Sequence, residues 1–441
     1  MSSSTRLEGK SGLEQTAEKI ASRQAKVVVV GLGYVGLPLC LEFAKAGFNA
    51  TGIDINSAKV ESLNRGKSHI LDVQDTDLKS CLEKEKFKAV ENYNPLKEAD
   101  VIIICVPTPL NKTREPDVSC IIAVGEQIAR YIRRGQVIIL ESTTYPGTTE
   151  EVILPMLEQK GGKVGEDFCL AFSPERIDPG NRNFSTATIP KIVGGVTPRC
   201  TEFAKKVYES IVKKVVVVSS SRVAEMTKLL ENTFRAVNIA LVNELALMCA
   251  KLNINVWEVI DAAATKPFGF MPFYPGPGLG GHCLPIDPIY LAWKAKLHGF
   301  ESRFIELASQ INAYMPNYVV EKVMAALNEK NKPMKSSKLL VLGVTYKKNV
   351  NDIRESPALD IIEMLKERGA VVKFHDPYIS SLDSIQWTAL TPAALKEQDA
   401  VLLLTDHDQF DYDVIIRNSV LIIDTRNAFR NYRGFSNTIR I

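Results

Sequence analysis

Short runs of aliphatic and β-branched residues recur along the first third of the chain, with stretches of mixed polarity between them. These runs cover residues 27–30, 50–55, 101–106 and 137–140. Such runs are typical of strands buried on both faces of a parallel sheet, and the stretches between them are long enough for helices. The alternation predicts a doubly wound sheet, in which ligands bind beyond the carboxyl ends of the strands.

The rest of the chain contains one long helical pattern and a second set of strands. Residues 221–252 carry apolar side chains at helical spacing, and the further apolar runs lie at 338–343, 371–374, 401–405 and 421–424. The predicted fold class is therefore α/β, with two Rossmann-like doubly wound parallel-sheet domains joined by a long central helix and a helical middle domain. The two sheets resemble an internal duplication.

Composition excludes several classes of protein. The 441 residues are 45% hydrophobic and 24% charged, with a net charge of +3, so we expect a globular protein that binds neither nucleic acid nor an anionic membrane. The sequence has no run of about 18 apolar residues, so no transmembrane helix is expected, and the polar N-terminus lacks the apolar core of a signal peptide. The eight scattered cysteines favour a reducing cytoplasm over disulfides or a metal site.

A glycine motif follows the first predicted strand. It reads Gly31-Leu32-Gly33-Tyr34-Val35-Gly36 and leads into a helix. Asp54 follows the first glycine by 23 residues and ends the second strand. Glycines at this spacing allow a tight turn and close approach of a pyrophosphate, and the acid can bind ribose hydroxyls. Because a carboxylate repels a 2′-phosphate, we expect NAD rather than NADP.

The most unusual segment lies between residues 267 and 288, where 11 of 22 residues are Gly or Pro. Cys283 follows a glycine pair, Gly280 and Gly281, and precedes a helix start at Asp287 and Pro288. A helix N-terminus lowers the pKa of a nearby thiol. The segment therefore predicts a nucleophilic cysteine with a carboxylate beside it. A buried, inert cysteine is the alternative.

Three further polar residues are candidates for the same chemistry. Lys228 and Asn232 are four residues apart and share one face of the central helix. They could stabilise a developing oxyanion, although an ordinary solvated lysine fits the same pattern. Glu175, in a second irregular loop, could position water or act as a base, or it could be a surface carboxylate.

Basic residues flank the first turn of the second α/β unit. Lys347 and Arg354 come after Gly343-Val344-Thr345-Tyr346, a segment that lacks the later fingerprint glycines. This half is therefore expected to bind phosphates through basic side chains rather than a second dinucleotide. His282, beside the candidate nucleophile, could donate to a substrate or could be structural.

These motifs together resemble those of the UDP-sugar 6-dehydrogenases, the NAD-dependent oxidases of UDP-glucose, UDP-N-acetylglucosamine and UDP-N-acetylmannosamine. The resemblance runs from about residue 26 to the C-terminus. The matching segments are GLGYVGLP at 31–38, CVPTPL at 105–110, ESTTYPGTT at 141–149, SPERIDPGN at 173–181, KLLENTFRAVNIALVNELA at 228–246, GPGLGGHCLPIDP at 276–288 and KKNVNDIRESPA at 347–358.

The resemblance implies a role for each matching residue. Cys283 is the implied nucleophile and Asp287 its helper in activating water, while Lys228 and Asn232 stabilise the oxyanion. Glu175 assists hydrolysis and Thr143 holds the water. The implied cofactor-binding residues are Gly31, Leu32, Gly33, Tyr34, Val35, Gly36, Asp54, Thr108, Thr143 and Arg354. The implied substrate-binding residues are Glu175, Arg176, Lys228, Asn232, Tyr274, Gly280, His282 and Lys347.

The same resemblance implies a four-electron oxidation. The C6 alcohol loses a hydride to NAD, and Cys283 attacks the aldehyde to form a thiohemiacetal. A second hydride leaves a thioester, which water hydrolyses to the uronic acid. The covalent bond holds the aldehyde while the cofactor exchanges. A hydroxy-acid dehydrogenase without a covalent step and a non-catalytic UDP-sugar-binding protein are the alternatives.

Two departures from the UDP-glucose branch favour an N-acetylhexosamine substrate. A second loop glutamate of that branch is replaced by Pro179 next to Asp178, and the cysteine loop reads GGHC with His282. We expect UDP-N-acetylglucosamine, with UDP-N-acetylmannosamine or UDP-glucose as alternatives. The expected product supplies surface polysaccharide, and a homodimer or larger homo-oligomer is expected.

The expected domain boundaries follow from these motifs. A polar N-terminal tail covers residues 1–22 and an NAD-binding Rossmann domain covers 23–218. A helical central domain with the catalytic loop covers 219–328, and a UDP-sugar-binding Rossmann-like domain covers 329–441.

Overall fold

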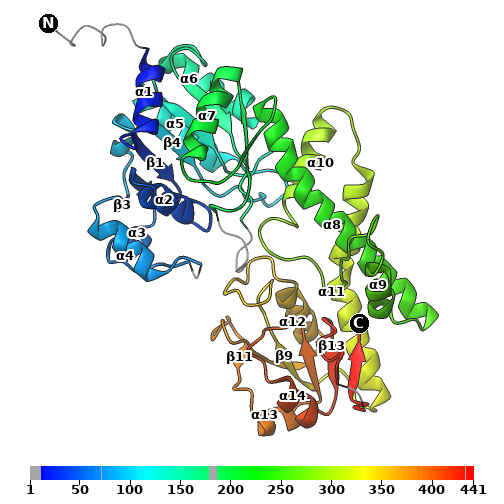
Figure 1. Ribbon diagram of the computed structural model, residues 1–441. Coiled ribbons are helices and arrows are strands. Elements are labelled where there is room, and N and C mark those ends of the chain that lie inside the picture. Colours follow the sequence, from blue (N-terminus) through cyan, green and yellow to red (C-terminus); the bar gives the residue numbers. More distant parts are fainter. Residues whose placement is uncertain (1–10, 71, 178–185, 433) are drawn as a thin grey trace, which may run out of the picture. The chain divides into compact units, whose positions relative to one another are not determined.

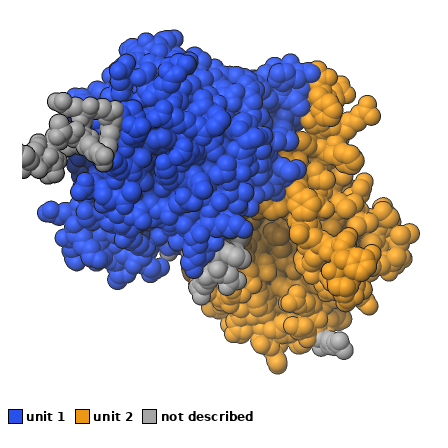
Figure 2. All heavy atoms as spheres, turned by 45° about the horizontal axis from the view of Figure 1, so that its top comes forward, with its two compact units in different colours: residues 1–231, 289–298 blue, residues 232–288, 299–441 orange. Residues whose placement is uncertain are grey.

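The computed structural model describes residues 11–70, 72–177, 186–432 and 434–441 (Figure 1). The chain divides into two compact units, coloured separately in Figure 2. The first unit comprises Met1–Glu231 and Ile289–His298, and the second comprises Asn232–Pro288 and Gly299–Ile441. Each unit contains one sheet and its own hydrophobic core.

The first unit contains an eight-stranded sheet in the order β3-β2-β1-β4-β5-β6-β7-β8. Every neighbouring pair is parallel except β6 and β7. The strands are β1 (Lys26–Val30), β2 (Asn49–Ile53), β3 (Phe87–Val90), β4 (Val101–Ile104), β5 (Val137–Leu140), β6 (Cys169–Phe172), β7 (Lys191–Gly195) and β8 (Val215–Val217).

Both faces of this sheet are buried, as the apolar runs predict. Along β1, Val27 and Val29 join one core cluster while Val28 and Val30 join another, because successive side chains point to opposite faces of a strand. The covering helices are α1 (Gly12–Ala21), α2 (Gly36–Lys45), α3 (Ser57–Asn64), α4 (Asp75–Glu83), α5 (Ser119–Tyr131), α6 (Leu154–Gly161) and α7 (Pro198–Glu209), with a 3₁₀-helix at Asn94–Lys97 and a π-helix at Thr149–Ile153.

Helix α1 lies within the segment that the sequence predicts to be a polar tail. Ser11 and Glu14 form a capping box, and Leu13 and Ile20 are buried against the first sheet's core. The polar composition of this segment does not indicate a helix, because only a few of its positions are apolar. The spacing of those few positions places them on one helix face.

Helix α8 spans Ser221–Leu252, as the helical pattern predicts. Within the described ranges it is the one helix whose length and mean hydropathy, 1.3 over 18 residues, would suffice to cross a membrane, and 39% of that window is buried. A long helix of a protein core passes the same test. Its buried polar residues, Glu225, Lys228, Asn232 and Asn243, contact other protein groups.

The second unit repeats the doubly wound topology in six strands. All neighbours are parallel in the order β11-β10-β9-β12-β13-β14. The strands are β9 (Lys338–Leu342), β10 (Val371–His375), β11 (Gln386–Trp387), β12 (Ala400–Leu403), β13 (Ile422–Asp424) and β14 (Thr438–Arg440), and the helices are α9 (Val256–Ala264), α11 (Arg303–Glu329), α12 (Pro357–Glu367), α13 (Pro392–Lys396) and α14 (Tyr412–Asn418). Helix α10 (Asp287–Leu297) follows the irregular segment. The predicted fold class is confirmed.

Candidate active site

The glycine motif forms the turn between β1 and α2. Gly31 has a φ of +95°, and a Cβ there would lie 2.4 Å from the Cys105 carbonyl oxygen. A Cβ at Gly36 would lie 1.8 Å from the Gly31 carbonyl oxygen, whereas a Cβ at Gly33 would point into open space. The first and third glycines therefore permit the turn and the helix packing, and the second leaves room for a phosphate group above the helix N-terminus. These residues fit a dinucleotide.

Asp54 lies directly after β2 and is held in place by the same turn. Its Oδ2 accepts a hydrogen bond from the Leu32 N–H at 3.1 Å, and its Oδ1 accepts one from the Asn56 N–H at 3.0 Å. The Lys59 Nζ lies 3.4 Å from Oδ2. A carboxylate has about four acceptor sites, so acceptor capacity remains for ribose hydroxyls. Tyr34 and Val35 complete the turn.

Thr108 and Thr143 follow neighbouring strands of the first sheet, β4 and β5, and both are partly buried. Thr143 lies between two buried residues, Ser142 and Thr144. The Thr144 and Thr148 hydroxyl oxygens are 2.6 Å apart, which closes the loop beyond it. The loop therefore holds the Thr143 backbone while leaving its side chain partly accessible.

Glu225 was not predicted from the sequence. Its carboxylate connects α8 to the loop that follows Thr143. Its carboxylate accepts hydrogen bonds from the Gly147 N–H at 2.6 Å, the Thr149 N–H at 2.9 Å and the Thr149 hydroxyl at 2.7 Å. Burial raises the pKa of Glu225 to about 7, while the three donors act in the opposite direction. Because Glu225 lies about one helical turn before Lys228, its position on the same helix face could have indicated that it lies near the site.

Lys228 and Glu175 form a buried ion pair in the first unit. The Lys228 Nζ lies 2.7 Å from the Glu175 carbonyl oxygen and 3.2 Å from its Oε2. Both residues are less than 10% exposed, so neither is the solvated surface charge of the alternative interpretation. Arg176 donates to the Pro190 carbonyl at 2.8 Å and pairs with Glu231. Residues 178–185, including Asp178 and Pro179, lie outside the described residues.

Cys283, Asp287 and Asn232 are brought together in the second unit. The Cys283 carbonyl oxygen accepts hydrogen bonds from the Ile286 N–H at 3.1 Å and the Asp287 N–H at 2.8 Å, so the cysteine lies in the turn that leads into α10. The Asp287 carboxylate accepts a hydrogen bond from the Asn232 amide, whose oxygen in turn accepts one from Arg235. Asp287 and Asn232 are buried, and Cys283 is partly exposed.

The glycine pair before the cysteine packs against an aromatic ring. A Cβ at Gly281 would lie 2.8 Å from the Tyr346 ring, and one at Gly280 would lie 2.7 Å from the Tyr346 Cβ. The neighbouring His282 Nδ1 lies 3.3 Å from the Arg354 guanidinium. A Cβ at Gly280 would also lie 2.8 Å from the Glu355 carbonyl oxygen, and Gly281 has a φ of +82°, so both positions require glycine.

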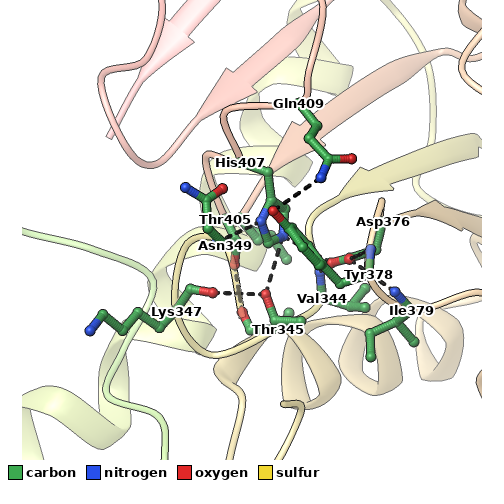
Figure 3. Close-up of polar contacts among 12 residues, drawn as sticks. Val344, Thr345, Lys347, Asn349, Asp376, Tyr378, Ile379, Thr405, His407 and Gln409 are labelled. Atoms are coloured by element: carbon green, nitrogen blue, oxygen red, sulfur yellow. Dashed lines mark hydrogen bonds and ion pairs between the residues drawn. The ribbon is translucent and has the colours of Figure 1, made fainter. Parts of the chain in front are cut away.

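The remaining predicted residues have other contacts in the second unit. Arg354 pairs with Asp352 at 2.6 Å, and Tyr274 donates to Asp261 at 2.8 Å while its ring stacks on Trp257. Lys347 lies in the turn after β9, beside a buried cluster around His407 (Figure 3). The roles assigned to these side chains stay predictions.

Three protein-family models match this chain. They describe the NAD-binding domain (residues 25–212), the central domain (222–314) and the UDP-binding domain (340–431) of the UDP-glucose/GDP-mannose dehydrogenase family.

Individual relatives are similar in sequence to this chain over most of its length. A UDP-N-acetyl-D-glucosamine 6-dehydrogenase from Pseudomonas aeruginosa is 36% identical over 393 residues, which cover 88% of this chain and 92% of the relative. A UDP-N-acetyl-D-mannosamine dehydrogenase from Pyrococcus horikoshii is 36% identical over 92% of this chain and 96% of its own length. A solved UDP-D-ManNAc dehydrogenase structure from Pyrococcus horikoshii superimposes with a TM-score of 0.86 at 35% identity, covering 94% of this chain and 99% of the other.

Proposed function

Because this chain belongs to the UDP-glucose/GDP-mannose dehydrogenase family, and is therefore an NAD-dependent UDP-sugar dehydrogenase, we propose that it oxidises the C6 hydroxyl of UDP-N-acetylglucosamine to the uronic acid. NAD, when bound, accepts the hydrides. The product is a precursor of surface polysaccharide, made in the cytoplasm. The free state of all eight cysteines fits a reducing compartment.

The proposal assigns a task to each buried polar pair. The Cys283 thiolate attacks the aldehyde, and the oxyanion of the thiohemiacetal that forms is stabilised by the Lys228 ammonium and the Asn232 amide. Asp287 orients Asn232 and takes a proton from the water that cleaves the thioester. Glu175, fixed by Lys228, assists this hydrolysis together with Thr143.

One observation carries this proposal. Asp287 engages the Cys283 backbone through its own N–H and the Asn232 amide through its carboxylate. The same residue therefore fixes the turn that carries the cysteine and the amide that is the candidate oxyanion donor, which supports a site built around the Cys283 thiol.

The sugar and the stoichiometry are tested together. We expect two NADH for each sugar consumed, and the highest kcat/KM for UDP-N-acetylglucosamine in a panel with UDP-N-acetylmannosamine, UDP-N-acetylgalactosamine and UDP-glucose. Absorbance of NADH and product mass are the measurements. One NADH per sugar would rule out the covalent two-step reaction, and a preference for another sugar would replace the substrate assignment.

We also propose that the protein is a homodimer. Helix α8 exposes Phe234, Leu241, Met248 and Leu252 at helical spacing, each with at least 45% of its surface accessible. An exposed apolar stripe of this kind marks an interaction surface, and its occupant here is the same stripe of a second copy.

A double substitution tests this dimer. Leu241→Asp with Met248→Asp is expected to convert the dimer to a monomer, because paired charges repel across a two-fold interface. Light scattering coupled to gel filtration measures the mass, and Glu244→Gln on the same helix is the matched control. A wild-type protein that is monomeric at micromolar concentration would disprove the dimer.

A further inference from the structure

The second sheet keeps an acid where the first sheet has Asp54. In the first unit the Asp54 Oδ2 accepts from the Leu32 N–H at 3.1 Å, and in the second unit the Asp376 Oδ2 accepts from the Val344 N–H at 2.8 Å. Each carboxylate also uses Oδ1 to accept from the N–H two residues further on. Asp376 therefore occupies the place from which a doubly wound sheet binds ribose.

A histidine covers this acid in the second unit. Strand β12 pairs with β9 in the second sheet as β4 pairs with β1 in the first. Thr108 lies four residues after Ile104, the end of β4. His407 lies four residues after Leu403, the end of β12, and so occupies the corresponding position. His407 is fully buried, and its Nε2 lies 3.1 Å from the Asp376 Oδ2. Asp376 itself is 2% exposed. Asp376, the counterpart of Asp54, is thus hydrogen-bonded to an imidazole and buried in the protein interior.

The other bonds of His407 hold the turn that contains Lys347. The Nδ1 accepts a hydrogen bond from the Asn349 N–H at 3.0 Å, so the ring proton is on Nε2. The Nε2 also lies 3.1 Å from the Thr345 hydroxyl, which donates to the Lys347 carbonyl at 2.9 Å. Figure 3 shows the Lys347 side chain extending away from this buried cluster.

We propose that His407 is a positioning residue for substrate binding: it fixes the turn at residues 345–349 so that Lys347 is presented to the phosphates of the UDP-sugar. The inference rests on the proposed function, because the phosphate contact of Lys347 belongs to it. The turn is fixed from both sides, since one ring nitrogen bonds to Asn349 and the other to Asp376 and Thr345.

Two substitutions separate the two sides of the ring. The amide nitrogen of His407→Gln reaches the Nε2 position and keeps the bond to Asp376, but leaves the Asn349 N–H without its acceptor. The amide oxygen of His407→Asn reaches the Nδ1 position and keeps that acceptor. UDP binding to the full chain is measured by calorimetry, with NAD binding and Tm recorded alongside. His298→Gln, on an exposed histidine, is the matched control.

We expect His407→Gln to weaken UDP binding about tenfold, with a smaller loss for His407→Asn and unchanged NAD affinity. In a Lys347→Ala background the effect of His407→Gln should disappear, because both act through one contact. Wild-type UDP affinity in His407→Gln, or an undiminished effect in the Lys347→Ala background, overturns the inference. If Lys347→Ala alone binds UDP normally, the proposed role of Lys347 fails and the inference falls with it.

Discussion

A Cys283→Ala variant is expected to lose uronic acid formation by about a thousandfold or more, because the thiolate both traps the aldehyde and forms the thioester that water hydrolyses to the uronic acid. NAD binding should be unchanged, since the glycine turn and Asp54 belong to the other compact unit. The measurements are product mass, the rate of NADH formation and NAD affinity.

Two further cysteine substitutions serve as controls for this experiment. Cys120 is the exposed cysteine among the eight, and Cys120→Ala should retain full activity. Cys283→Ser keeps the size of the side chain with a poorer nucleophile, so it should resemble Cys283→Ala in rate. Undiminished uronic acid formation by either Cys283 variant would remove the nucleophile from the mechanism.

The second large effect is expected from Lys228→Met, with a fall in kcat of about a hundredfold to a thousandfold, as for the loss of one oxyanion donor. The substitution also leaves the Glu175 carboxylate buried without its cation, which costs about 3–5 kcal/mol of stability. Kinetics at saturating substrate and thermal unfolding measure the two effects.

A double variant separates catalysis from stability. Lys228→Met with Glu175→Gln removes both charges, so most of the stability should return while kcat stays low. Lys251→Met, on an exposed position of the same helix, controls for the substitution. If activity returned together with stability, Lys228 would be a structural residue only.

The elements that could be predicted from the sequence share a simple local signal. The buried strands have continuous apolar runs, the central helix has an apolar repeat over its full length, and Asp287 with Pro288 marks the start of α10. Strands β7 and β8 were missed: β7 has only two apolar side chains before two glycines, and β8 is an edge strand of three residues that follows it through α7.

The residues around the site were harder to predict where their partners are distant in sequence. A glutamate inside a helix resembles any surface charge, and only the fold shows Glu225 bonding to the loop at 147–149. His407 lies in a polar segment after β12, and its link to Asp376 depends on the pairing of β9, β10 and β12. By contrast, Cys283 and its glycines are neighbours in the chain, so local composition was enough to make them candidates.

The packing of Gly280 and Gly281 on Tyr346 has an evolutionary consequence. A methyl group at Gly280 would also meet the Glu355 carbonyl oxygen at 2.8 Å, and Gly281 has a φ of +82°. A smaller side chain at 346 would therefore relieve neither glycine. Both positions are expected to stay glycine in related lineages, even in those where the aromatic ring is lost.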